Sequence, residues 1–180
     1  KEALFSFLEI LKIIILALVV VLPIRYFIFQ PFVVQGASME PNFQQGNYLI
    51  VDEISYRFRS PQRGDIIVFK YPQKPSIKFI KRVIGLPGEK IKFENGLITI
   101  INQKGESIIL DEKEYLKNFY FLDNKEFIVP VEEYFVLGDN RAHSYDSRGW
   151  GAVPENYIIG KVFLRLSPPT EINSFPTPEY

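Results

Sequence analysis

The fold class is decided by the stretch Ile77-Lys78-Phe79-Ile80-Lys81-Arg82-Val83-Ile84-Gly85. It is rich in β-branched and aromatic residues and contains no proline, so it predicts a β-strand. Side chains of a strand alternate between two faces, which puts Lys81 among Ile77, Phe79 and Val83 as the one polar group on its face. Burial on such a face would lower the pKa of a lysine from about 10.4. Lys81 is then either a general base or a lysine that extends its charge to a sheet edge, and the strand by itself leaves both interpretations open.

Similar short segments lie on both sides of this strand, and they predict a mainly β fold. The turn Asn95-Gly96 between two of them is typical of a tight β-hairpin, because both turn residues need positive φ angles. The predicted strands are Tyr48 to Val51, Asp65 to Phe69, Ile77 to Ile84, Lys90 to Phe93, Leu97 to Ile101, Phe127 to Val129, Tyr134 to Leu137 and Tyr157 to Leu166. The segment Asp111 to Phe121 fits a short helix or an irregular arm equally well.

Proline spacing predicts how this β structure is divided, because prolines recur up to Pro87 and again from Pro130. The stretch between them contains no proline and reads as a small β insertion into one antiparallel-sheet core. We therefore expect a core made of residues 30–87 and 130–167, an inserted β subdomain of residues 88–129, and a C-terminal tail of residues 168–180.

The N-terminal segment is much more apolar than the rest of the chain. From Ala3 to Ile24 only Glu9 and Lys12 interrupt it. A helix of this length would span roughly 33 Å, against a hydrocarbon core of about 30 Å. We predict one transmembrane helix over residues 3–25, with a cleaved signal peptide and a soluble core helix as the alternatives. Bulky residues follow the apolar run where signal cleavage needs small ones, which favours a retained anchor. Because the chain begins at Lys1, we expect further residues before it.

Composition excludes several classes of function. The 180 residues include 21 basic and 21 acidic side chains, and this balance argues against a nucleic-acid platform. The 47% of hydrophobic residues is too high for a disordered chain. With no Cys and one His, thiolate zinc sites, disulfides and multi-histidine metal sites are excluded. We therefore expect no metal ion and no cofactor.

Two other segments have unusual chemistry. The first, Gln35 to Pro41, places Ser38 after two small residues, where a ligand can approach the backbone closely. The second, Leu137 to Gly151, is dense in Asp, Asn, Ser and Arg, and this favours a loop held by Asp-Arg pairs. Its two acidic residues are too few and too far apart for a calcium loop of the EF-hand type.

Taken together, the three segments resemble the bacterial type I signal peptidases, which are membrane-anchored serine proteases with a Ser/Lys dyad. The matching motifs, in chain order, are Ser38-Met39-Glu40-Pro41, Gly64-Asp65, Lys81 to Glu89, Gly138-Asp139-Asn140-Arg141, Ser144, Asp146-Ser147-Arg148, Gly151 and Gly160-Lys161-Val162. The resemblance extends from the N-terminal apolar segment to about Leu166. Each motif alone is only modest evidence for the resemblance, but the order and spacing of all the motifs make the match highly specific.

The resemblance implies a role for each residue of the site. Ser38 would be the nucleophile and Lys81 the general base, with Ser144 orienting the lysine through a hydrogen bond. The oxyanion hole would combine the N–H of Ser38 with a second donor at the position of Gly36, where many members carry a hydroxyl and this chain has none. The residues that would shape the site structurally are Arg82, Asp139, Asp146 and Arg148.

The resemblance also implies a substrate and a location. The enzyme would remove signal peptides from exported preproteins, cleaving after small residues at A-x-A sites through an acyl-enzyme. The substrate would lie extended beside residues 32–35 and 78–81, in shallow pockets lined by Phe32, Val34, Met39 and Ile80. We expect a single-pass protein of the bacterial cytoplasmic membrane, with the catalytic domain on the extracytoplasmic side. Its partners would be signal peptides and the lipid bilayer.

Three alternatives remain open at this point. His143 would serve in a Ser/His/Asp triad, which would leave the lysine on an apolar face unexplained. A self-cleaving repressor-like protein uses the same Ser/Lys chemistry but would carry a helical DNA-binding domain where this chain has its apolar segment. The third alternative is a catalytically impaired, membrane-tethered β-domain that only binds exported chains.

Overall fold

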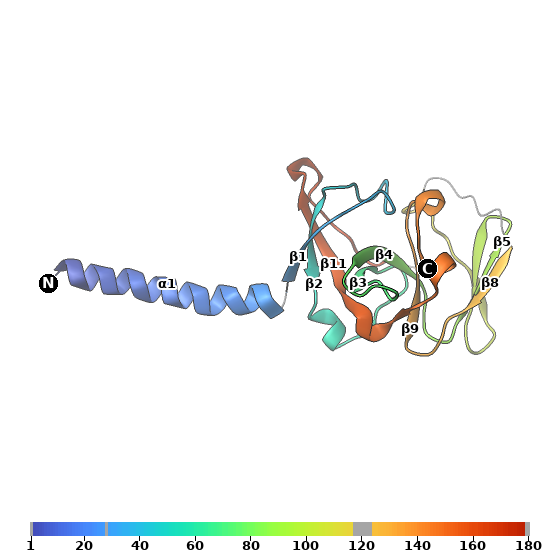
Figure 1. Ribbon diagram of the computed structural model, residues 1–180, viewed down its shortest axis with the longest axis horizontal. Coiled ribbons are helices and arrows are strands. Elements are labelled where there is room, and N and C mark those ends of the chain that lie inside the picture. Colours follow the sequence, from blue (N-terminus) through green and yellow to red (C-terminus); the bar gives the residue numbers. More distant parts are fainter. Residues whose placement is uncertain (1, 28, 117–123, 179–180) are drawn as a thin grey trace.

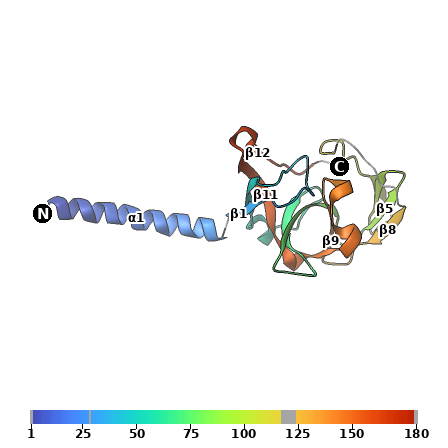
Figure 2. The same ribbon diagram turned by 45° about the horizontal axis from the view of Figure 1, so that its top comes forward.

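The computed structural model describes residues 2–27, 29–116 and 124–178. Helix α1 (Glu2–Phe27) extends away from a body built mainly of antiparallel strands (Figure 1). The prediction of a mainly β fold is confirmed. In both views the strands form two groups, with the smaller sheet on the side of the body remote from α1 (Figure 2).

The larger sheet has eight strands among the described residues, all paired antiparallel. Its order is β1-β2-β11-β3-β4-β9-β10, and β12 pairs with β11 beside this path. The strands are β1 (Phe29–Val33), β2 (Tyr48–Asp52), β3 (Ile66–Lys70), β4 (Lys78–Gly85), β9 (Glu133–Leu137), β10 (Val153–Pro154), β11 (Ile158–Ser167) and β12 (Asn173–Ser174). The stretch that decided the fold class is thus β4, which lies between β3 and β9.

The smaller sheet has the order β7-β6-β5-β8 in the described part of the chain. Its strands are β5 (Lys90–Glu94), β6 (Leu97–Ile101), β7 (Ser107–Ile109) and β8 (Lys125–Ile128). The β5–β6 hairpin turns at Asn95 and Gly96, whose φ angles of 51° and 78° are those a tight hairpin turn requires. The hairpin prediction is confirmed, whereas the division of the chain into core and inserted subdomain stays a prediction.

Short helices occupy the connections: η1 (Ser55–Arg57), η2 (Arg141–His143), α2 (Ser147–Trp150), η3 (Glu155–Tyr157) and η4 (Pro169–Glu171). The segment Asp111 to Phe121 is a turn over 113–115 and neither helix nor strand as far as residue 116. Its remainder lies outside the described residues. Sequence patterns missed β1, β7, β10 and β12, since each is short, interrupted by proline or largely exposed.

The buried core continues from one sheet to the other. One cluster joins the small sheet to β4 and β9, through contacts among residues such as Ile91, Ile100, Ile84 and Leu137. All four of these side chains are at most 1% exposed. Two further clusters lie around β3, β4 and β11. The strand β4 therefore contributes to all three clusters, which holds it rigidly between its neighbours.

Helix α1 covers the residues predicted to cross a membrane, so their helical conformation is confirmed. Within the described residues, no helix is both long enough and apolar enough to span a bilayer.

Candidate active site

Ser38 lies in a turn between β1 and β2, and two buried side chains hold this turn in place. Met39 and Phe43 are at most 1% exposed and belong to the core, and the N–H of Phe43 donates to the carbonyl of Met39 at 2.9 Å. The adjacent Gly36 has a φ of +81°, a left-handed conformation that glycine adopts at little cost. The nucleophile candidate therefore sits on a short, firmly anchored turn with its own side chain half-buried.

Lys81 comes from the middle of β4, and its amine meets this turn. Its Nζ lies 2.6 Å from Oγ of Ser38 and 2.9 Å from the carbonyl oxygen of Ile80. The lysine is only 3% exposed, and Nζ lies 5.3 Å from the centre of the Phe79 ring. Burial lowers the pKa of Lys81 to about 8, although the negative charges of Asp146 and Asp139 act in the opposite direction.

A loop of residues 138–151, which we call the 138–151 loop, follows β9 and covers the other side of the turn. In the sheet register Leu137 pairs with Arg82, so the loop starts beside Lys81 and Arg82. The backbone N–H of Asn140 donates to the carbonyl of Ser38, and its side-chain amide donates to that of Ala37, both at 3.0 Å. These two hydrogen bonds attach the 138–151 loop to the turn that carries Ser38.

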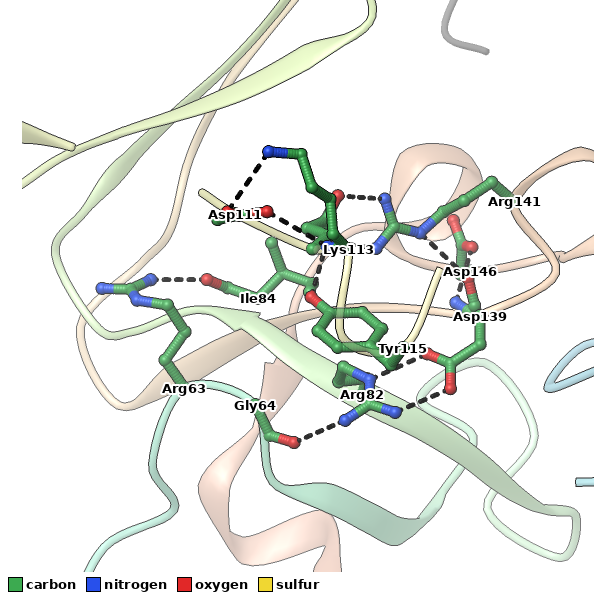
Figure 3. A network of polar contacts seen from close by, with 12 residues as sticks. Arg63, Gly64, Arg82, Ile84, Asp111, Lys113, Tyr115, Asp139, Arg141 and Asp146 are labelled. Atoms are coloured by element: carbon green, nitrogen blue, oxygen red, sulfur yellow. Dashed lines mark hydrogen bonds and ion pairs between the residues drawn. The ribbon is translucent and has the colours of Figure 1, made fainter. Parts of the chain in front are cut away.

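Two ion pairs shape this loop, one of them fully buried and the other with a partly exposed guanidinium. Arg82 donates from Nε and Nη2 to the carboxylate of Asp139, both at 2.8 Å, with the two side chains at most 4% exposed (Figure 3). Arg148 makes the same two-bond contact with Asp146 at 2.8 Å. Asp146 also accepts from the N–H of Gly138 at 3.1 Å, which ties the start of the loop to the residue just before α2. The four residues expected to shape the site thus form two ion pairs, Arg82 with Asp139 and Arg148 with Asp146.

Ser144 lies close to the serine turn, but the predicted hydrogen bond to Lys81 does not form. Its Oγ is buried and has no hydrogen-bond partner among the described residues. A Cβ added to Gly138 would lie 2.2 Å from that Oγ and 2.3 Å from the carbonyl oxygen of Ser38. Only glycine at position 138 therefore lets the hydroxyl of Ser144 and the backbone of Ser38 approach each other this closely.

A cleft of about 690 Å³ opens over Ser38 and Lys81, between the end of β1 and the start of β4. Of the predicted pocket residues, Phe32 and Ile80 line it, whereas Val34 and Met39 are core side chains that do not. The other lining residues are Pro31, Val33, Gln35, Gly36, Ala37, Ser76, Ile77, Lys78, Phe79, His143 and Tyr145. A cleft with apolar walls beside a serine and a buried lysine can hold an extended peptide with its carbonyl at Ser38.

His143 also borders this cleft, yet no hydrogen bond joins it to Ser38 in the part of the chain that the structure describes. Sequence reasoning missed Tyr145 as a cleft residue, and it placed Phe79 beside the substrate without naming it among the pocket residues. Tyr145 lies in the loop and Phe79 on β4, and only the folded sheet shows that both face the same cavity.

The chain is similar to several known proteins. Residues 7–167 match the family described as signal peptidase, peptidase S26. The probable signal peptidase I-2 of Synechocystis sp. is 38% identical, over 91% of this chain and 74% of that protein. The signal peptidase I of Leptolyngbya laminosa is 39% identical, over 94% and 85% respectively. The crystal structure of a signal peptidase I from Enterococcus faecalis V583 covers 58% of this chain and 97% of its own at 33% identity, with a TM-score of 0.47. The chain belongs to the signal peptidase I family of serine endopeptidases, peptidase family S26.

Proposed function

We propose that this protein removes signal peptides from exported preproteins, with Ser38 as nucleophile and Lys81 as general base. The observation that carries the proposal is the 2.6 Å separation of Lys81 Nζ and Ser38 Oγ, at a lysine whose pKa is lowered by burial to about 8. A serine hydroxyl attacks a peptide carbonyl efficiently only when an adjacent base takes its proton. A neutral amine within hydrogen-bonding distance is such a base.

The chemistry proceeds in two halves. Lys81 takes the proton from Ser38 as the hydroxyl attacks the carbonyl, and it returns that proton to the leaving amine. The acyl group stays on Ser38 until a water, activated by the same lysine, hydrolyses the ester. The N–H of Ser38 stabilises the oxyanion, and we assign the second donor to the neighbourhood of Gly36, whose open left-handed backbone leaves space for a main-chain N–H or a water.

The remaining residues of the site support these two. We propose that Ser144 orients the amine of Lys81 only during the reaction, since its buried Oγ has no partner among the described residues and is available to accept a hydrogen bond from Nζ at that stage. Arg82 with Asp139 and Arg148 with Asp146 keep the 138–151 loop against the turn. Neither ion pair takes part in proton transfer.

The substrate lies extended in the cleft beside residues 32–35 and 78–81. In the described sheet, β1 is an edge strand, so its unpaired main-chain groups are available to a peptide strand. Phe32 and Ile80 narrow the cleft near Ser38 and favour small side chains such as Ala at −1 and −3. We place Val34 and Met39 beneath these walls, where their volume sets the depth of the pockets.

The proposal includes membrane attachment through α1. Large apolar side chains are exposed along this helix; among the described ones are Phe7, Ile10, Leu11, Ile13, Ile14, Ile15, Leu16, Leu18 and Val19. A soluble protein seldom exposes so many apolar residues in one place. We propose a single-pass anchor in the bacterial cytoplasmic membrane, with the β body outside the cytoplasm and residues 88–129 inserted into it as a subdomain.

The test is cleavage of a preprotein with an A-x-A site by wild type, Ser38→Ala and Lys81→Ala. Both variants should lose at least 10³-fold in kcat/KM, roughly the loss expected when a nucleophile or its base is removed. Lys70→Ala is the matched control, since Lys70 is an exposed lysine of the neighbouring strand β3 that does not line the cleft, and His143→Ala tests the histidine that borders the cleft. Full activity in Ser38→Ala or Lys81→Ala, or an equal loss in His143→Ala, would overturn the dyad.

A further inference from the structure

Residues 110–116, which we call the strap, follow the smaller sheet and pack against the active-site segments. Glu112 is only 1% exposed, and its carboxylate accepts two hydrogen bonds from Arg141 of the 138–151 loop. One of them joins Nη1 and Oε2 at 2.8 Å. The hydroxyl of Tyr115 donates to the same carboxylate at 2.7 Å. A buried acid is thus used for an ion pair that no step of the peptidase chemistry requires.

The strap also reaches the two segments that carry Ser38 and Lys81. The guanidinium carbon of Arg82, the residue after Lys81, lies 3.9 Å from the centre of the Tyr115 ring. Asn42, in the turn that begins at Ser38, donates to the carbonyl of Tyr115 at 2.9 Å and to Asp139 at 2.8 Å. Figure 3 shows Tyr115 between Arg82 and Arg141.

Arg141 connects the strap to the rest of the 138–151 loop through two further hydrogen bonds. Its Nε donates to the carbonyl of Gly138 at 3.1 Å, and its own carbonyl accepts from Nη2 of Arg148 at 2.7 Å. Gly138 is the residue that brings Ser144 and the backbone of Ser38 together. A shift of Arg141 would therefore move Gly138 relative to Ser38.

A buried ion pair contributes little net stability compared with an apolar pair of the same volume, because both charges lose their hydration. What the pair does supply is a fixed geometry, since two parallel hydrogen bonds define the orientation of both side chains. Between Gly138 and Ser144 the regular structure of the loop is the single 3₁₀ turn η2 (Arg141–His143). Its position consequently depends on side-chain contacts such as this one.

We propose that Glu112 is a positioning residue, which acts through Arg141 to hold the 138–151 loop against the Ser38 turn. The strap thereby makes a segment of the predicted insertion part of the active-site structure. This inference rests on the proposed Ser38/Lys81 peptidase activity.

The experiment compares the purified full chain with its Glu112→Gln variant in preprotein cleavage and in amide hydrogen exchange. We expect kcat to fall by about tenfold or more with KM within about twofold, because small misplacements of reacting groups slow the chemical step. Exchange should accelerate across residues 138–148. Lys113→Ala is the matched control, because this strap lysine is 81% exposed and pairs only loosely with Asp111 at 3.5 Å. Wild-type kcat in a folded Glu112→Gln variant would overturn the inference.

Glu112→Gln leaves the charge of Arg141 buried without its partner, so this variant is at risk of not folding. The double variant Glu112→Leu/Arg141→Met removes both charges while it keeps the volume. A positioning role predicts a thermal midpoint close to wild type together with a reduced kcat, whereas a merely structural pair predicts that kcat recovers with stability. Ser38→Ala separates the two proposals: if it retains activity, the proposed function fails, and if it is inactive while the Glu112 variants cleave normally, only the positioning role fails.

Discussion

At the scale of single residues, Lys81 combines two demands that oppose each other. Burial suppresses its charge, which the proposed chemistry needs, but burial of an ionisable amine also destabilises the fold. Asp146 and Asp139 lie close enough to raise its pKa again, so their charges limit how far the pKa falls. Arg148 and Arg82 neutralise these two carboxylates and reduce that opposing effect.

The first prediction concerns the pH dependence of cleavage. Because the base must be neutral, kcat/KM should rise with pH through an apparent pKa near 8 and fall about tenfold per pH unit below it. The measurement is a pH-rate profile with a peptide substrate that carries no titrating group between pH 6 and 10. A profile that stays flat from pH 8 down to pH 6 would contradict a lysine base.

The second prediction concerns stability. Between pH 8 and 10.5 the unfolded chain binds more protons at Lys81 than the folded chain does, so this residue makes stability rise with pH over that window. Below pH 8 both the folded and the unfolded chain hold the proton of Lys81, so the destabilisation caused by burying the charged amine is fully present. Lys81→Met should therefore raise the free energy of unfolding at pH 7 by about 2 kcal/mol, after allowance for the lost hydrogen bonds.

Denaturant unfolding at pH 7 and pH 10 measures this effect. The difference between Lys81→Met and wild type should shrink at the higher pH, while Lys78→Met, at an exposed position of β4, should match wild type at both. A constant difference would mean that the folded-state pKa of Lys81 is not lowered.

At the scale of elements, the strand that carries Lys81 was the most predictable part of the molecule. Its alternation of side chains and its β-branched residues identify β4 to within one residue at each end. The Asn95-Gly96 hairpin was equally clear, because its turn chemistry is local. Local patterns also located Ser38 in a turn and the Asp146–Arg148 pair in a loop, whereas the partner of Asp139 is Arg82 of β4.

What the sequence could not predict depends on contacts between distant segments. Nothing in the residues 110–116 indicates that Glu112 meets Arg141, 29 positions away, or that Tyr115 packs on Arg82. Nor does the pattern around Val34 and Met39 tell whether they face the cleft or the core, since both need apolar residues. The strand β1 contains a proline and so lacks the usual strand signal.

The third prediction addresses the connection from β4 to β5, where the chain passes from the larger sheet to the smaller one. Glu89 accepts two hydrogen bonds from Arg63, at 2.9 and 2.7 Å, and one from the N–H of Leu86 at 2.7 Å. Glu89→Ala should lower the free energy of unfolding by about 3 kcal/mol, because it leaves a largely buried guanidinium without its partner.

Chemical denaturation checks this value, with Glu126→Ala as the control. Glu126 forms an ion pair with Lys90 in which both side chains are more than 40% exposed, so its loss should leave the unfolding midpoint unchanged. Equal midpoints for Glu89→Ala and Glu126→Ala would show that the connection is held by its apolar contacts alone.

At the scale of the whole molecule, the β body and the helix α1 have opposite surface character. The body buries its apolar side chains in clusters that continue from the larger sheet into the smaller one. Helix α1 instead extends from the body (Figure 1), and the apolar side chains that the structure describes on it, such as Leu16 and Val19, are exposed. A preprotein bound in the cleft between β1 and β4, as proposed, would lie close to the C-terminal end of α1, because α1 ends at Phe27 and β1 begins at Phe29.

The fourth prediction follows from this arrangement. If α1 anchors the protein, the full chain should float with phospholipid vesicles in a density gradient and stay bound at high salt, since the attraction is apolar and not electrostatic. Leu16→Lys/Val19→Lys should abolish flotation, because each charge placed in the hydrocarbon costs about 3 kcal/mol. Ile109→Lys is the matched control: Ile109 is 64% exposed, much as Leu16 is 65% exposed, but lies on β7 of the body. Flotation of the double variant at the wild-type level, or its loss in Ile109→Lys, would place the membrane contact on the β body rather than on α1.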